Sequence, residues 1–186
     1  LEAFNAREFD VLYLDDPVDE LLVQFLTEYD GKPPKSAAKG AAELGDTKER
    51  EETRKDLEEK AKDLEELLGS IQEHLDEHVK EVRLSSRLTT SPACLVGGEH
   101  DMSPQLERLL RHTQQHAPRS KRILELNGNH EVISKLAAHF ESQPDDAVIA
   151  DTADLLYGYA LLAEGSELPD PARFTSLLAR LMVVGL

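Results

Sequence analysis

Residues 147–163 read AVIADTADLLYGYALLA, a long apolar run that is the main guide to the architecture. Its apolar side chains would cover more than one face of the helix that we expect at about 145–164. A helix that is apolar on several faces has to be covered on several sides. The sequence therefore predicts a largely buried helix that contacts more than one neighbour.

A second apolar helix is expected at about 171–184, after Pro169-Asp170-Pro171. The two helices carry more apolar surface than a small sheet can cover. A helical hairpin that packs on its symmetry mate as a four-helix bundle would bury this surface, because most soluble oligomers close with two-fold symmetry. The alternative is that both helices pack within the monomer. The predicted homodimer interface comprises Ile149, Ala153, Leu156, Tyr157, Ala160, Leu161, Phe174, Leu177, Leu178, Leu181 and Met182.

A long amphipathic helix and a small sheet are expected before this hairpin. Apolar residues recur at alternating three- and four-residue steps from Leu57 to Val79, and Gly69 is the expected site of a kink or break. Runs at 79–87, 93–97 and 121–126 read as strands because turn formers flank them. One more helix is expected at about 130–141.

The first forty residues read as a separate small unit. Residues 9–14 are prone to form a strand, and Asp15-Asp16-Pro17 is typical of the start of a helix. Residues 36–46 are small and aperiodic, as in a linker. We therefore expect an α+β protein with a small α/β unit at 1–40 and a second domain at 41–186.

The charge balance excludes some classes of partner. The chain has 37 acidic and 21 basic residues and a formal net charge of -16, so it would be repelled by nucleic acid and by anionic membranes. Its most apolar stretch, 148–163, contains Asp151 and Asp154 and is too short to span a bilayer. A single cysteine, Cys94, and an opening sequence unlike a secretion leader favour a soluble, cytoplasmic protein.

One candidate binding surface precedes the third strand. Ser103-Pro104 would begin a short helix whose apolar stripe could adapt to varied partners, since flexible surfaces that contain methionine adapt easily. The alternative is that the leucines face the sheet of their own domain. The stripe consists of Met102, Leu106, Leu109 and Leu110.

Metal and enzyme chemistry find little support in the sequence. His74 with His78, and His112 with His116, have a spacing that suits a zinc pair, but no third ligand is evident. A zinc-dependent enzyme is therefore a remote alternative. Neither a phosphate loop nor a Ser-His-Asp set is recognisable. We expect no catalytic residue, no metal and no cofactor in this chain.

Several motifs, in order, resemble the heat shock protein 90 family of molecular chaperones, and in particular its bacterial HtpG type. Nearly the whole chain is covered by the resemblance. The motifs are FDVLYL at 9–14, EYDGK at 28–32, VRLSSRL at 82–88, SPA at 91–93, LELN at 124–127 and LLYGYALLAEG at 155–165. Gly128 and Glu131 depart from the family pattern, so a looser start is expected for the helix near 130. The MEEVD tail of the eukaryotic cytosolic members is absent from the sequence.

The resemblance implies a function. Residues 1–40 would be the end of the middle domain, and residues 41–186 the carboxy-terminal dimerisation domain of an ATP-dependent chaperone. ATP and magnesium would bind in the nucleotide-binding domain, outside this sequence. The implied partners are a second copy of the chain and unfolded client proteins. In the family, the helix around Met102 is associated with client contact, and Leu21 and Gln24 match a position that can face the cleft between subunits.

Overall fold

The computed structural model describes residues 1–14, 16–40, 44–98, 101 and 120–184. For residues 17, 20, 21, 24 and 184, which lie in helices, it describes the backbone alone.

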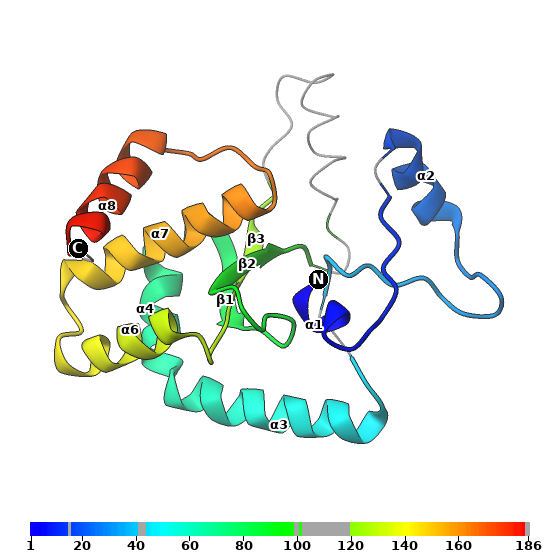
Figure 1. The fold of residues 1–186 in the computed structure, drawn as a ribbon, viewed down its shortest axis with the longest axis horizontal. Coiled ribbons are helices and arrows are strands. Elements are labelled where there is room, and N and C mark those ends of the chain that lie inside the picture. The colour runs from blue at the N-terminus through cyan, green and yellow to red at the C-terminus, as the bar shows by residue number, and fades with distance from the viewer. Residues whose placement is uncertain (15, 41–43, 99–100, 102–119, 185–186) are drawn as a thin grey trace.

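A three-stranded mixed sheet forms the centre of the molecule (Figure 1). The strands β1 (Val79–Leu84), β2 (Ala93–Val96) and β3 (Arg122–Leu126) lie in the order β1-β3-β2. β3 runs parallel to β1 and antiparallel to β2. Four of the five β3 residues are buried, as expected of a central strand covered on both faces. The predicted small sheet is confirmed.

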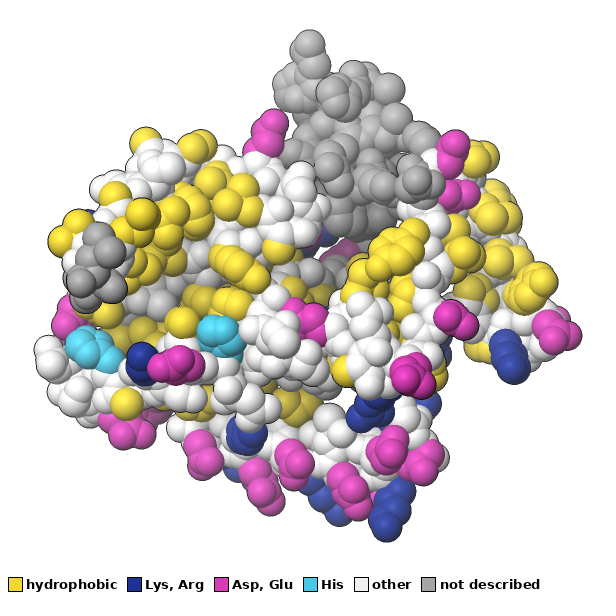
Figure 2. Space-filling model, viewed as in Figure 1, with side chains coloured by type: hydrophobic (Ala, Val, Ile, Leu, Met, Phe, Trp, Pro, Cys, Tyr) yellow, Lys and Arg dark blue, Asp and Glu magenta, His cyan; other side chains and the backbone are white. Residues whose placement is uncertain are grey.

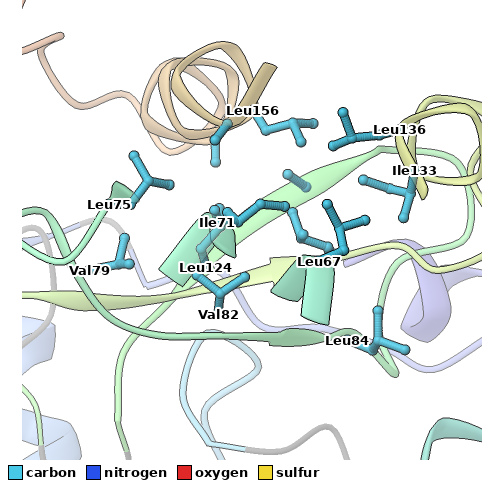
Figure 3. Close-up of a cluster of buried hydrophobic side chains, with 14 of the residues drawn as sticks. Leu67, Ile71, Leu75, Val79, Val82, Leu84, Leu124, Ile133, Leu136 and Leu156 are labelled. Atoms are coloured by element: carbon cyan, nitrogen blue, oxygen red, sulfur yellow. The ribbon is translucent and has the colours of Figure 1, made fainter. Parts of the chain in front are cut away.

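Three helices cover one face of this sheet. α4 (Glu65–His74), α6 (Glu131–Ser142) and α7 (Ala147–Ala163) bring leucine and isoleucine side chains onto those of the strands, as Figure 3 shows. Ile71 and Leu124, which belong to this cluster of side chains, are fully buried. This cluster is the main hydrophobic core of the described residues.

The long helix breaks earlier than the sequence predicted. α3 (Thr47–Asp63) begins with a capping box between Asp46 and Glu49, and Leu64 is its C-cap. Gly69 lies inside α4, so the prediction of a break there was wrong. α3 has no buried residue, whereas α4 buries Leu67 and Ile71. Packing of α4 on the sheet therefore sets the position of the break.

The three C-terminal helices agree with the sequence prediction. α6 and α7 are followed by α8 (Pro171–Val184). α6 begins at Glu131, and the His130 ring accepts a hydrogen bond from the Val132 amide at 3.2 Å. Its start is therefore regular and capped, contrary to the looser start that we expected from Gly128 and Glu131.

The N-terminal residues differ from the predicted α/β unit. They form α1 (Glu2–Asn5) and α2 (Pro17–Phe25), with Asp16 capping α2 as expected. Residues 9–14 are not a strand, so that prediction was wrong. No described strand lies beside them to accept their hydrogen bonds, and Leu12 is 83% exposed. Between residues 1 and 35, strand-like pairing is described only for the Tyr29–Lys32 bridge.

Among the described residues, no helix has both the length and the apolar character needed to cross a bilayer.

Candidate functional site

α7 has two apolar faces, and the sheet covers only one of them. The covered face carries Ile149, Ala153, Leu156 and Ala160, which all belong to the hydrophobic core. The other face leaves Val148 and Leu162 about half exposed. These two residues are fourteen positions apart, which is close to four helical turns, so they share a face. α7 therefore keeps an apolar surface that the sheet does not use.

α8 packs along α7 and covers another part of it. Leu177 is buried between the helices, and the Phe174 ring lies against Gly158 of α7. A methyl group at position 158 would stand 2.6 Å from Cε2 of Phe174. The absence of a side chain at Gly158 therefore allows the two helices to approach closely.

Charged groups fix α8 in this position. Arg173 Nε donates to Asp154 Oδ2 at 2.6 Å, and Arg180 Nη2 lies 2.6 Å from Asp151 Oδ2. The other carboxylate oxygen of Asp154 is 2.8 Å from Nε2 of His74 on α4. The hydrogen bond and charge of Asp154 raise the pKa of the Arg173 guanidinium. These contacts connect α4, α7 and α8.

The outer side of α8 is apolar and exposed. Figure 2 shows hydrophobic side chains gathered over α7 and α8 on the viewed face. We call the exposed valine, leucine and methionine residues of the two helices the hairpin surface. It consists of Val148, Leu162, Leu178, Leu181, Met182 and Val183. Large exposed apolar surfaces of this kind are typical of sites where another protein binds.

A model of the Hsp90 protein family matches residues 1–186, the whole chain. The chain belongs to the Hsp90 family. It is 52% identical over 179 residues to the chaperone protein HtpG of Frankia casuarinae. It is 50% identical over 187 residues to HtpG of Rhodococcus jostii, and 50% identical over 179 residues to HtpG of Mycobacterium avium. Each match covers 96% of this chain but 28% of the relative, so the chain spans about 28% of the length of these curated relatives.

Within this Hsp90-family chain, the eleven predicted interface residues fall into two groups. The buried or partly buried group packs inside the single chain, where Tyr157 stacks on His78 with ring centroids 5.3 Å apart. It consists of Ile149, Ala153, Leu156, Tyr157, Ala160, Leu161, Phe174 and Leu177. The exposed group is Leu178, Leu181 and Met182, which belong to the hairpin surface. The interface itself stays a prediction, and the exposed group is the part of it that a partner could reach.

Sequence reasoning missed three residues of the hairpin surface: Val148, Leu162 and Val183. The signal was present on α7, because Val148, Leu155, Tyr159 and Leu162 follow one another at steps of seven, four and three residues, which keep to one helical face. Two such series share one helix, and the sequence does not say which series faces the sheet.

The predicted client-binding residues fall mostly outside what the structure describes. Met102, Leu106, Leu109 and Leu110 lie outside the described residues, and the side chains of Leu21 and Gln24 are likewise not described. Three described neighbours of Leu21 and Gln24 on α2 are exposed: Val18, Leu22 and Phe25. The client-binding assignment therefore stays a prediction.

The described histidines of the two pairs, and Cys94, have contacts that suit a structural role. His74 is paired with Asp154, His78 stacks on Tyr157, and His112 and His116 lie outside the described residues. In the part of the chain that the structure describes, no three potential ligands come together. Burial, assisted by the charge of Glu125, raises the pKa of the Cys94 thiol to about 12. This thiol is therefore protonated and poorly nucleophilic at neutral pH.

Proposed function

We propose that this chain is the self-association module of a bacterial HtpG-type chaperone and that it joins two subunits through α7 and α8. The observation that carries the proposal is the hairpin surface, which remains exposed after the monomer core has formed. Two copies that pair these helices about a two-fold axis would bury the surface in a four-helix bundle.

The geometry of the hairpin supports this arrangement. One side of α7 is held by the sheet, and α8 is held on α7 by Phe174, Leu177 and the arginine–aspartate pairs. The hairpin surface is thus presented on a fixed backbone. Binding to a preformed surface costs less conformational entropy than binding that must first order two helices.

We also propose a place for the chain in the longer chaperone. Residues 1–40 would be the end of the middle domain, and residues 41–186 the carboxy-terminal domain. The exposed Leu12, Phe25 and Tyr29 support this placement, because a small unit with so little apolar cover is typical of part of a larger domain. ATP and magnesium would act in a separate domain of the cytoplasmic full-length protein.

Joining two subunits would have a mechanistic consequence. A permanent connection raises the effective concentration of the two nucleotide-binding domains for each other. Their closure on a shared client then becomes an intramolecular step. The proposed partners are therefore a second copy of the chain and unfolded proteins held between the two subunits.

The second candidate function is client binding by α2. Val18, Leu22 and Phe25 form an exposed apolar group on α2, well away from α8 in Figure 1. Such a group could bind apolar segments of an unfolded protein. The stripe from Met102 to Leu110 is the other site that we proposed for this role.

One matched pair of variants separates the two functions. Leu181 on α8 is 54% exposed and Leu22 on α2 is 52% exposed, so Leu→Ser removes a similar apolar surface at each position. We expect Leu181→Ser to weaken self-association at least about tenfold, since burying a leucine contributes roughly 1.5–3 kcal/mol. Leu22→Ser should leave the mass unchanged. Light scattering over a dilution series measures both.

Aggregation of an unfolded substrate gives the reciprocal measurement. If α2 binds clients, Leu22→Ser lowers suppression of aggregation while the dimer persists. A parent chain that remains a folded monomer at high concentration would contradict the self-association proposal. Equal weakening of the dimer by both variants would contradict its location on α8.

A further inference from the structure

The sheet face opposite the helices carries a buried charged network. Glu125 on β3 is 2% exposed, and Arg87, just beyond β1, is 3% exposed. Arg87 Nε donates to the Glu125 carboxylate at 2.7 Å, and the Ser85 hydroxyl donates to the same oxygen at 2.8 Å. Arg83 Nη2 donates to the other oxygen at 2.8 Å. The carboxylate therefore holds the Arg87 guanidinium in a fixed orientation.

The remaining donors of Arg87 point to the backbone before α3. Nη1 donates to the carbonyl of Ala37 at 2.7 Å, and Nη2 donates to the carbonyl of Gly40. The backbone at 38–40 also pairs with the end of β2. The Gly40 amide donates to the Gly97 carbonyl at 3.1 Å, and the Gly97 amide donates to the Ala38 carbonyl at 3.2 Å. Residues 37–40, which the sequence placed in a linker, are therefore docked on the sheet.

The start of the chain docks on the same region. The Ala3 amide donates to the carbonyl of Arg87 at 3.1 Å. The Glu2 carboxylate accepts hydrogen bonds from the amides of Thr89 and Thr90 at 2.6 and 2.7 Å. Arg87 thus binds α1 with its carbonyl group and residues 37–40 with its side chain. Residues 5–36, which include α2, extend from the sheet between these two attachments (Figure 1).

We propose that residues 85–91 form a two-point latch, in which Arg87 serves both points and fixes where residues 5–36 enter and leave the sheet. Undocking residues 37–40 would remove two acceptors from a buried guanidinium, and a buried charge that loses its partners is strongly destabilising. The latch therefore holds both ends of the segment 5–36 on the sheet. A force on α2 would pass into the connection between β1 and β2. The latch does not depend on self-association.

Gly40 offers a way to open one point without replacing a charged residue. Its φ is +61°, and no atom lies within 4 Å of the place where a Cβ would stand. Valine is strongly disfavoured at this φ, whereas asparagine tolerates it. Gly40→Val should therefore release residues 37–40, and Gly40→Asn is the matched control.

Amide hydrogen exchange of the 186-residue chain tests the attachment of residues 37–40. We expect the Gly97 amide to exchange about tenfold faster or more in Gly40→Val, and to change little in Gly40→Asn. The Leu124 amide in β3 should keep its protection in both variants, which shows that the sheet is folded. Equal Gly97 exchange in the parent and in Gly40→Val would overturn the proposal.

A distance measurement tests whether both points hold the segment. Spin labels at the exposed positions Val23 on α2 and Glu141 on α6, in a Cys94→Ala background, report the position of α2 relative to α6. We expect a narrow distribution in the parent, modest broadening in Gly40→Val or Glu2→Ala, and wide broadening in the double variant. Full broadening in either single variant would overturn a two-point latch, as would a double variant as narrow as the parent.

Discussion

Gly158 is the residue on which the contact between α7 and α8 depends most directly. The Phe174 ring occupies the space that a side chain would fill, and Leu168 approaches the same space at 3.3 Å. Glycine weakens a helix, so its presence in the middle of α7 has a cost in stability. The close packing of α8 offsets that cost.

We predict that Gly158→Ala destabilises the chain by about 1–2 kcal/mol, because overpacking outweighs the better helix propensity of alanine. Gly69→Ala in α4 is the matched control, since no atom lies within 4 Å of its Cβ position. The control should stabilise the fold by about 0.5–1 kcal/mol. Urea denaturation measures both changes. A stabilising Gly158→Ala would show that Phe174 can move aside without loss.

Glu2 is the residue at which pH should act on the N-terminal attachment. Burial alone would raise the pKa of Glu2, but hydrogen bonds from Ser91, Thr90 and Thr89 lower it from 4.5 to about 2. A lowered pKa means that the ionised carboxylate stabilises the folded state. This contribution is fully present above pH 4.5 and is lost as the pH falls toward 2.

We therefore predict that the Thr89 and Thr90 amides lose protection from hydrogen exchange between pH 4.5 and 2. In Glu2→Gln, the Thr89 and Thr90 amides should be weakly protected at every pH. The same variant also reports any general acid unfolding. The parent and the variant should converge near pH 2. A difference that persists unchanged at that pH would contradict the role of the carboxylate.

At the scale of elements, α8 is attached to the rest of the chain by a narrow contact. Its inner side is held by Phe174, Leu177 and the arginines, while its outer side is exposed. Arg173 reaches both Asp151 and Asp154. Because Arg173 is about half exposed, solvent screens these pairs and their contribution is modest.

We predict that Arg173→Met lowers stability by about 0.5–1 kcal/mol at low salt, mainly by loosening α8. The effect should shrink at about 1 M salt, where screening acts over about 3 Å. Arg54→Met is the control, because Arg54 forms an exposed ion pair with Glu58 on α3. Denaturation curves at both salt concentrations give the comparison. An Arg173 effect that is independent of salt would indicate lost packing of its stem instead.

At the scale of the whole molecule, charge and apolar surface act in opposite directions on self-association. Each chain carries a formal net charge of -16, so two chains repel each other. In the proposed dimer, the hairpin surface would supply the attraction through apolar burial, which salt does not screen. The balance between them should therefore depend on ionic strength.

We predict that self-association strengthens severalfold as salt rises from about 50 mM to about 500 mM, because the repulsion between acidic chains is screened. Sedimentation equilibrium at several salt concentrations measures the dissociation constant. Leu181→Ser should show the same salt trend with a weaker constant throughout. Weaker association at high salt would indicate an interface held by ion pairs rather than by the hairpin surface.

The elements that local chemistry controls could be predicted from the sequence. Asp16 with Pro17, and Asp146 before α7, mark helix starts because their carboxylates accept amide hydrogen bonds that the first turn leaves free. The strand ranges and the last three helices also followed from periodicity and turn residues. The ordered motifs between residues 9 and 165 indicated the family, which the match over the whole chain confirmed.

Tertiary structure alone decided how these elements are used. Residues 9–14 have strand-forming side chains but no described neighbour to pair with, and the helix break moved from Gly69 to Leu64 because α4 had to lie on the sheet. Which apolar face of α7 is buried, and the docking of residues 37–40 by Arg87, depend on residues far apart in the chain. Local propensity carries no information about such long-range contacts, so the sequence left them open.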